Sequence, residues 1–283
     1  MKHPVTYLFV PADRPERFAR AHACGADAVI FDLEDSVAPG EKARAGANVR
    51  AWVESHPDTA ARAIVRINGV ATPWFDADLD LLRQGGIQFA MLPKTEAAAA
   101  IAAVMAALPP AGGVLALIET ARGVDEAAAI AAARGVVRLV FGTLDYALDL
   151  DLSGDERGLV YPAARIAHAS RRAGLPSPVG GVTSAIDDEA RLLSDLAFDR
   201  AFGFGAKLCI HPKQVAVVHR ALLPTDAEID WAKRVLAAAA EAHGAVQVDG
   251  RMVDRPVVLK AESILDRAAA DSDSIASRSP GFA

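Results

Sequence analysis

Short runs of apolar residues alternate with longer amphipathic segments along most of this chain. The apolar runs are unbroken, as is typical of parallel β-strands that are buried on both faces. They predict eight strands, at residues 6–12, 27–35, 61–68, 88–94, 114–120, 137–143, 177–182 and 206–212.

Segments rich in strong helix formers separate the predicted strands. They predict helices at residues 16–23, 41–56, 73–85, 96–108, 123–134, 161–174, 187–203 and 212–223. Eight strand-and-helix repeats within about 220 residues favour an α/β fold of the (β/α)₈ TIM-barrel type. A doubly wound open sheet is the alternative.

The chain continues beyond the last predicted barrel helix. A helical run at residues 225–244 precedes a strand-like run at 245–265, and the final residues are small and polar. We therefore expect a barrel domain at residues 1–223, a C-terminal lid extension with helix and hairpin at 224–270, and a disordered tail at 271–283.

Composition narrows the class of protein. The 283 residues are 52% apolar, enough to bury a full core. The net charge of −6 comes without a basic block, so neither nucleic acid nor a membrane is an expected partner. Since the sequence shows neither a signal peptide nor an apolar stretch of roughly 18 residues, we expect a cytoplasmic protein. Cys24 and Cys209 are expected to stay reduced.

Two carboxylates stand where apolar runs give way to turns. Glu119 ends the run VLALIET and Asp145 follows the run VRLVFGT, 26 residues later. A βαβ unit delivers both side chains to the same sheet edge, where they could hold a divalent cation. Oxygen ligands without nearby Cys or His favour Mg²⁺ or Mn²⁺ over zinc. The alternative is that these residues are a helix cap and an exposed turn acid.

Other polar residues end neighbouring strands and would share the C-terminal face of a barrel. Arg66 has the geometry to clamp the carboxylate of a 2-oxo acid, or else to form an ion pair with a buried acid such as Glu34. We expect Asp32 and Glu34 to position Arg66 or metal-bound water. Lys94 raises the alternative of a metal-free aldolase that uses a Schiff base. The further candidates that line this face are Asp35, Asn68 and His211.

Seven blocks in fixed order resemble the citrate lyase β-subunit-like proteins of the HpcH/HpaI aldolase/citrate lyase family. They are FVPADRPERF, DAVIFDLEDSVAPGEK, VRING, MLPKTE, LIETARGV, VFGTLDYALDL and CIHPKQV, and the resemblance spans about residues 6–265. It implies a Mg²⁺-dependent barrel that acts on the carbon–carbon bond between an acyl-CoA and a 2-oxo acid. Glu119 and Asp145 would be the metal ligands, and Arg66, Glu119, Gly142 and Thr143 would contact substrate.

The block RMVDRP resembles the lid segment of citramalyl-CoA and malyl-CoA lyases in the same family. The resemblance implies a homo-oligomer, a trimer or hexamer, in which Asp254 of one subunit carries a proton at the site of its neighbour. Ala12 and Ala206 depart from the family pattern, which has glycine at both positions. Each adds a methyl group where backbone is expected to approach a ligand.

The expected reaction is retro-Claisen cleavage of a citramalyl-CoA, malyl-CoA or citryl-CoA type of substrate to acetyl-CoA and a 2-oxo acid, with pyruvate preferred. Glu119 and Asp145 would hold the metal, Arg66 the carboxylate, and Asp254 would protonate the enolate. Two alternatives stay open. One is a metal-dependent aldolase that acts on hydroxy-oxo acids without CoA, and the other is a non-catalytic barrel subunit.

Overall fold

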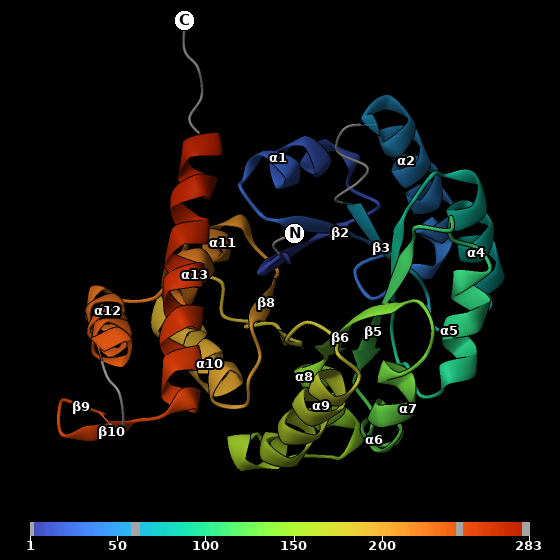
Figure 1. The fold of residues 1–283 in the computed structure, drawn as a ribbon. Helices are drawn as coiled ribbons and strands as arrows, with labels where there is room; N and C mark the ends of the chain where they lie inside the picture. The colour runs from blue at the N-terminus through green and yellow to red at the C-terminus, as the bar shows by residue number, and fades with distance from the viewer. Residues whose placement is uncertain (1–2, 58–62, 242–245, 279–283) are drawn as a thin grey trace, which may run out of the picture. The chain divides into compact units, whose positions relative to one another are not determined.

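The computed structural model describes residues 3–57, 63–241 and 246–278. These form two compact units, one from His3 to Val218 and one from His219 onwards. The division falls inside helix α11 (Pro212–Leu222), whereas the sequence suggested a boundary after residue 223. Figure 1 shows the elements of both units.

The first unit is a closed parallel barrel, as predicted. Its strands are hydrogen-bonded in chain order, and β8 pairs with β1 to close the ring. They are β1 (Thr6–Pro11), β2 (Ala28–Asp32), β3 (Ala63–Arg66), β4 (Phe89–Leu92), β5 (Gly113–Ile118), β6 (Val136–Phe141), β7 (Val179–Gly180) and β8 (Ala206–Cys209).

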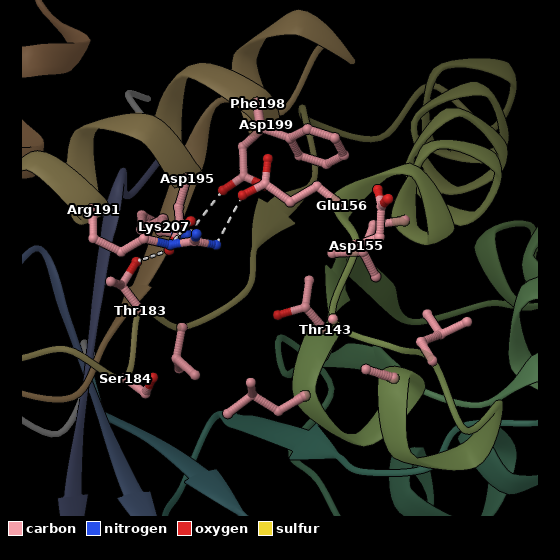
Figure 2. Close-up of a pocket in the computed structure, with 16 residues that line it drawn as sticks. Thr143, Asp155, Glu156, Thr183, Ser184, Arg191, Asp195, Phe198, Asp199 and Lys207 are labelled. Atoms are coloured by element: carbon pink, nitrogen blue, oxygen red, sulfur yellow. Dashed lines mark hydrogen bonds and ion pairs between the residues drawn. The ribbon is translucent and has the colours of Figure 1, made fainter.

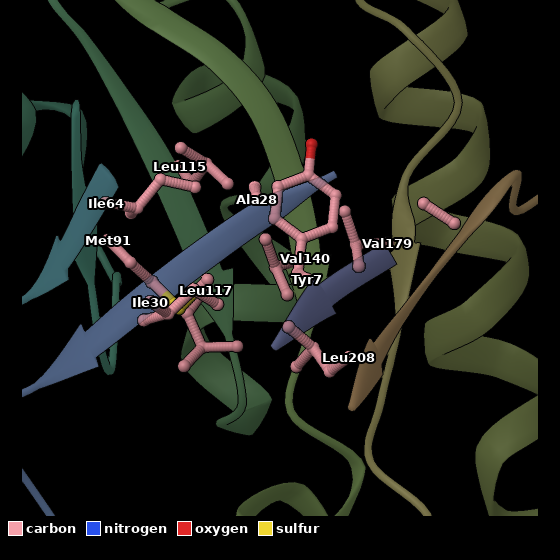
Figure 3. Close-up of a cluster of buried hydrophobic side chains, with 11 residues drawn as sticks. Tyr7, Ala28, Ile30, Ile64, Met91, Leu115, Leu117, Val140, Val179 and Leu208 are labelled. Atoms are coloured by element: carbon pink, nitrogen blue, oxygen red, sulfur yellow. The ribbon is translucent and has the colours of Figure 1, made fainter. Parts of the chain in front are cut away.

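Alternate strand residues point into the barrel and fill it (Figure 3). This period of two is the strand geometry that the apolar runs require. The inner cluster consists of Tyr7, Ala28, Ile30, Ile64, Met91, Leu115, Leu117, Val140, Val179, Ala206 and Leu208. The barrel is therefore a packed core, and chemistry is confined to its rim.

Several strands end before the apolar pattern does. Beyond two of these strands a backbone N–H group donates to a side chain: Glu34 N–H donates to Asp32 Oδ1 at 2.9 Å, and Ile210 N–H donates to Gln214 Oε1 at 2.9 Å. Such local bonds compete with the sheet ladder and terminate it. The predicted strands at 27–35 and 206–212 consequently stop at Asp32 and Cys209.

Helices surround the strands (Figure 1). They are α1 (Phe18–Ala23), α2 (Lys42–Ser55), α4 (Phe75–Gln84), α5 (Ala98–Met105), α6 (Ala121–Asp125), α7 (Ala127–Ala131), α8 (Thr143–Asp149), α9 (Val160–Arg172), α10 (Glu189–Ala201) and α11, with 3₁₀ turns η1 (Pro15–Arg17), η2 (Pro39–Glu41) and η3 (Glu156–Leu159). The helix predicted at 123–134 is divided between α6 and α7. Helix α8 was not predicted, and it places Asp145 in a helical first turn.

The second unit contains α12 (Asp226–Glu241), a hairpin of β9 (Val246–Val248) and β10 (Arg251–Val253), and α13 (Arg255–Arg278). Asp249 and Gly250 form the turn with φ of 52° and 74°, as a two-residue hairpin of type I′ requires. Helices α12 and α13 pack through a cluster of Ala232, Val235, Ala261 and Ile264.

One expectation for the second unit was wrong. Residues 255–265 are helical rather than strand-like, because Asp254 caps α13: its Oδ1 accepts the Val257 N–H at 3.2 Å. The same helix extends to Arg278. Residues 279–283 lie outside the described residues. Among the helices that the structure describes, none combines the length and apolar character needed to cross a membrane.

Candidate active site

A buried guanidinium joins the ends of β2 and β3. The strand register pairs Asp32 with Arg66, whose Nε and Nη2 donate to Asp32 Oδ1 and Oδ2 at 2.7 Å each. Arg66 Nη1 lies 3.0 Å from Glu34 Oε2 and 3.2 Å from Asp35 Oδ2. The ion pair that the sequence left as an alternative for Arg66 is thus present, with Asp32 as its main partner. Asp35 is the exposed and most distant contact.

The acids around Arg66 determine its charge and orientation. Burial alone would raise the pKa of Asp32, but the Arg66 charge and hydrogen bonds hold that pKa below its usual value. Arg66 stays cationic, because these carboxylates raise its pKa further against the effect of burial. Its guanidinium carbon lies 4.7 Å from the centre of the Phe9 ring, and this stacking fixes its plane.

Glu119 follows β5 and is almost fully buried, with 2% of its surface exposed. Its Oε1 accepts the Lys94 N–H at 2.8 Å. Lys94 has a φ of 46°, a left-handed conformation uncommon outside glycine, and it aims this N–H at the carboxylate. On the other side, a Cβ on Gly142 would clash with Glu119 Oε2, so the backbone after β6 lies directly against the carboxylate.

Asp145 lies in the first turn of α8, about one-third exposed. The Lys94 ammonium stands 3.9 Å from Asp145 Oδ1 and 3.8 Å from Glu34 Oε1. Burial lowers the pKa of Lys94, but the charges of Glu34, Glu119 and Asp145 outweigh it and raise the pKa overall. One cation therefore faces acids that come from three different strand ends.

The site holds more carboxylate than its lysine and arginine can balance. Burial, then the charges of Glu34 and Asp145, raise the pKa of Glu119 to about 8. Burial also raises the pKa of Glu34 to about 7, and its Oε2 has no hydrogen-bond partner although Arg66 is nearby. A buried group of acids with raised pKa values fits a divalent cation, because a cation would relieve their mutual repulsion.

No cluster of three or more His, Cys, Asp or Glu side chains suited to a metal exists within the ranges that the structure describes. A cation held by Glu119 and Asp145 would therefore complete its shell with water or ligand oxygens, which is the usual behaviour of Mg²⁺. These oxygen donors fit the Mg²⁺ or Mn²⁺ expected from the sequence.

Most of the predicted residues meet at one cavity of about 350 Å³. Its polar lining consists of Asp32, Asp35, Ser36, Arg66, Glu119, Thr143 and Asp145, and Gly142 is also part of the wall. Glu34 and Lys94 adjoin it through their contacts with Arg66 and Asp145. Asp254 is not part of the barrel unit: it lies in the second unit, where it caps α13.

Some sequence candidates have other partners. Asn68 donates to Asp78 of α4 through both its N–H and its side-chain amide, at 2.7 Å each, and so anchors the β3 loop. His211 Nδ1 accepts the Lys213 N–H at 3.2 Å. The methyl groups of Ala12 and Ala206 are buried in protein and do not line the cavity. The expectation that they face a ligand was therefore wrong.

Two residues of this site were not singled out from the sequence. Phe9 supports Arg66, and its block FVP precedes the first site loop. Asp149 Oδ2 accepts the Ala121 N–H at 2.8 Å and so joins the end of α8 to the residues after Glu119. The spacing of Asp149 could have identified it from the sequence, because it lies one helical turn after Asp145 and therefore on the same helix face.

Comparison with known proteins assigns the chain to a family. The model of the HpcH/HpaI aldolase/citrate lyase family matches residues 6–212. The chain belongs to this family. A second family model, described as a C–C bond lyase of the TIM-barrel fold, matches residues 163–272 and so includes most of the C-terminal unit. The family predicted from the seven sequence blocks is confirmed.

Similar members of the HpcH/HpaI family match nearly the full length of the chain. The citrate lyase subunit beta-like protein of Mycobacterium tuberculosis H37Rv is 40% identical over 270 residues, covering 93% of this chain and 94% of that protein. A (3S)-malyl-CoA thioesterase of Cereibacter sphaeroides is 35% identical over 282 residues, covering 95% and 96%.

A solved structure from the same family matches the fold. The crystal structure of CitE from Mycobacterium tuberculosis in complex with magnesium, acetoacetate and coenzyme A has a TM-score of 0.84 and 37% identity, covering 94% of this chain and 98% of that one. The barrel and the C-terminal unit therefore both have counterparts in a known family structure.

Proposed function

We propose that the protein is a Mg²⁺-dependent carbon–carbon lyase that cleaves a 3-hydroxyacyl-CoA to acetyl-CoA and a 2-oxo acid. The substrate would be of the citramalyl-CoA, malyl-CoA or citryl-CoA type, with citramalyl-CoA and pyruvate preferred. The observation that carries the proposal is the excess of buried carboxylate around Glu119, beside a cavity that also presents Arg66. The relative that binds magnesium, acetoacetate and coenzyme A supports it.

Glu119 and Asp145 would hold the cation, and Mn²⁺ could use the same oxygen donors. When bound, Mg²⁺ supplies Lewis-acid stabilisation for the negative charge that develops on substrate oxygen during cleavage. Glu119 is kept in place by the Lys94 N–H and by the close approach of Gly142. Lys94 is about half exposed and is free to turn its ammonium toward solvent.

Arg66 would bind the carboxylate of the 2-oxo acid. Asp32 occupies Nε and Nη2 and orients the guanidinium, so a substrate carboxylate would use Nη1, which it would share with Glu34 Oε2 at 3.0 Å. Asp35, with 58% of its side chain exposed, holds Nη1 only at 3.2 Å and can be displaced. A substrate carboxylate at Nη1 would gain a charge-assisted hydrogen bond from a buried guanidinium.

As the substrate hydroxyl gives up its proton to solvent and its carbon becomes the ketone, the bond between C2 and C3 of the thioester breaks, and the electron pair stays on C2 as the acetyl-CoA enolate. We propose that Asp254 of a neighbouring copy in a trimer or hexamer protonates this carbon. The support is its exposed position at the N-terminus of α13, immediately after a hairpin. Loss of this proton converts Asp254 to its carboxylate. A proton from solvent would then restore the acid.

A further cavity offers a place for the CoA phosphates. It measures about 420 Å³ and shares Phe9, Pro11 and Ile210 with the metal-site cavity. Arg17, Arg20 and His211 line it, and the two arginines are exposed. Arginine forks match phosphate oxygens well, so these groups are the proposed CoA phosphate contacts.

The test is a product analysis with citramalyl-CoA, malyl-CoA and citryl-CoA, each with Mg²⁺ and with EDTA. We expect acetyl-CoA and the matching 2-oxo acid only with Mg²⁺, and no activity in Glu119→Ala. Free CoA and a hydroxy acid without acetyl-CoA would instead assign thioester hydrolysis, the reaction named for the Cereibacter relative.

The remaining alternatives give different results in the same assays. Cleavage of free hydroxy-oxo acids, with none of the thioesters, would establish an aldolase. Borohydride trapping of pyruvate on Lys94, with activity retained in EDTA, would establish the Schiff-base route. Absence both of turnover and of Mg²⁺-dependent pyruvate binding would indicate a non-catalytic barrel.

A further inference from the structure

A side cavity lies next to the metal-site cavity (Figure 2). It measures about 240 Å³, and its walls come from α8, the segment leading into η3, the residues after β7, and α10. Thr143, Leu144 and Val182 line both cavities. The side cavity is smaller than the roughly 300–1,000 Å³ of a typical ligand pocket, so it suits part of a ligand rather than a whole one.

Lys207 shows on which side of the barrel wall this cavity lies. Ala206 and Leu208, its neighbours on β8, point into the barrel core, so Lys207 points outward. It binds Asp199 of α10 at 3.0 Å, and a Cβ on Gly180 of β7 would clash with that carboxylate. This buried pair closes the inner end of the side cavity.

The charged side chains of the side cavity have partners of opposite charge. Arg191 binds Glu156 of η3 at 2.9 Å and Asp195 at 2.7 Å, and the Thr183 hydroxyl donates to the same Asp195 at 2.6 Å. In Figure 2 this group and Lys207 face Thr143 across the cavity. The remaining pairs are Lys207 with Asp199 at 3.0 Å and Asp155 with Arg157 at 2.6 Å.

The rest of the lining is mainly apolar, from Leu144, Ala147, Leu152, Leu159, Val182 and Phe198. A carboxylate entering this space would lose water and would have to compete with existing ion pairs for a cation. An alkyl or hydroxyalkyl group would lose little, and burying it is favourable. The side cavity therefore selects for an uncharged group.

The barrel topology indicates which part of the substrate would reach it. Arg66 ends β3, whereas Val182 and Thr183 follow β7, four strands away in a closed ring of eight. An oxo acid whose carboxylate is held on the β3 side directs its other end across the cavity toward β7. Leu144, at the boundary, is 55% exposed and has room to move aside.

From this geometry we infer that the side cavity receives the substituent on the hydroxyl-bearing carbon, and that the enzyme prefers 2-oxo acids with a neutral side chain over those with a second carboxylate. The inference rests on the proposed function and narrows its substrate class. Substrates derived from pyruvate and its longer alkyl homologues fit the side cavity, whereas those derived from oxaloacetate do not.

The test measures Mg²⁺-dependent binding of pyruvate, 2-oxobutanoate, 2-oxopentanoate and oxaloacetate by calorimetry. We expect affinity to rise along the alkyl series, by up to about fourfold per added CH₂, and oxaloacetate to bind at least tenfold more weakly than 2-oxobutanoate. Ala147→Leu fills the side cavity. It should weaken the binding of 2-oxopentanoate at least tenfold and change the affinity for pyruvate by no more than twofold. Phe198→Ala enlarges the side cavity. It should increase the affinity for 2-oxopentanoate relative to the affinity for pyruvate.

Leu148→Ala is the matched control. Leu148 lies on α8 like Ala147 but is 80% exposed and outside both cavities, so this variant should bind all four acids with unchanged affinity. Oxaloacetate binding as tightly as the alkyl acids, or equal weakening of all four acids by Ala147→Leu, would overturn the inference while leaving the lyase proposal intact. Loss of Mg²⁺-dependent pyruvate binding in the unaltered protein would defeat both.

Discussion

Glu119 shows how one side chain acquires its chemistry from its surroundings. Its backbone position follows from an ordinary buried strand, but its raised pKa comes from burial and from acids on β2 and α8. The Lys94 N–H and the bare backbone of Gly142 hold it from two sides. The proposed cation would therefore favour the charged form of Glu119, because it would offset the repulsion from these acids.

Gly142→Ala tests this packing. The added methyl group would clash with Glu119 Oε2, so we expect the carboxylate to move and Mg²⁺ affinity to fall at least tenfold. Calorimetric titration with Mg²⁺ measures this. Since the new methyl group would also meet Glu119 Cβ at 2.6 Å, the metal-free protein should melt at a lower temperature as well, and Gly40→Ala, where a Cβ meets nothing, is the control. Unaltered Mg²⁺ affinity in Gly142→Ala would contradict the assigned contact.

Mg²⁺ affinity should depend on pH in a defined direction. Because the pKa of Glu119 is raised to about 8, protons compete with Mg²⁺ below that pH, and affinity should increase from pH 6 to pH 8 and then level off. Glu34→Gln removes one charge that raises this pKa, so its titration should shift to lower pH. Asp80→Asn, on α4, should leave the profile unchanged. A flat profile in the unaltered protein would refute the buried-acid explanation.

The same pKa shifts predict stability. In the metal-free protein Glu34 and Glu119 hold more protons in the folded state than in the unfolded state between pH 4.5 and about 8, so their contribution to the free energy of unfolding should fall as pH rises through this window. Urea titrations in EDTA at pH 5.5 and 8.5 measure it, and Glu34→Gln should reduce the difference.

Helix α8 is the element that assembles the site, because it brings Asp145 toward Glu119. Its N-terminus lies against Gly181, the residue after β7, where a Cβ would clash with the Thr143 hydroxyl. Its far end is held by the hydrogen bond from the Ala121 N–H to Asp149. Two attachments thus define where Asp145 sits relative to the strand that carries Glu119.

Asp149→Ala should loosen this helix. Losing one hydrogen bond worth about 1 kcal/mol would weaken Mg²⁺ binding by up to about fivefold without unfolding the protein. Asp149→Asn keeps an acceptor oxygen and should restore most of the affinity. Equal loss in both variants would show that the negative charge, and not the hydrogen bond, is what matters.

The two compact units divide the proposed chemistry between them. The barrel unit carries the binding groups, and the second unit carries Asp254. In the second unit Asp254 also caps α13, so a simple loss of activity in a variant would not separate catalysis from folding.

Paired substitutions of Asp254 separate these roles. Asn caps helices about as well as Asp but is not an acid, whereas Ala removes the cap at a cost of about 1 kcal/mol. We expect both variants to lose thioester cleavage while binding pyruvate and Mg²⁺ normally, and only Asp254→Ala to melt at a lower temperature. Normal cleavage in Asp254→Asn would eliminate this residue as the proton donor.

Much of the fold and part of the site could be predicted from the sequence alone. Unbroken apolar runs predict buried parallel strands whatever their surroundings, and polar residues at their ends predict a shared rim, so the barrel and the grouping of Arg66, Glu119 and Asp145 followed. The apolar pattern does not predict local hydrogen bonds, such as the one that Gln214 accepts from the Ile210 N–H. These bonds shortened the strands.

Tertiary packing alone decided the partner of Arg66, the protonation of Glu119, the position of α8 and the existence of the side cavity. Each depends on distances between segments that are far apart in sequence, such as the 2.7 Å bonds from Arg66 to Asp32. Apolar periodicity reports which face of an element is buried, but not which side chain of another element it meets. The pKa values and the shape of the cavities depend on these contacts between elements. Only the folded structure therefore determines them.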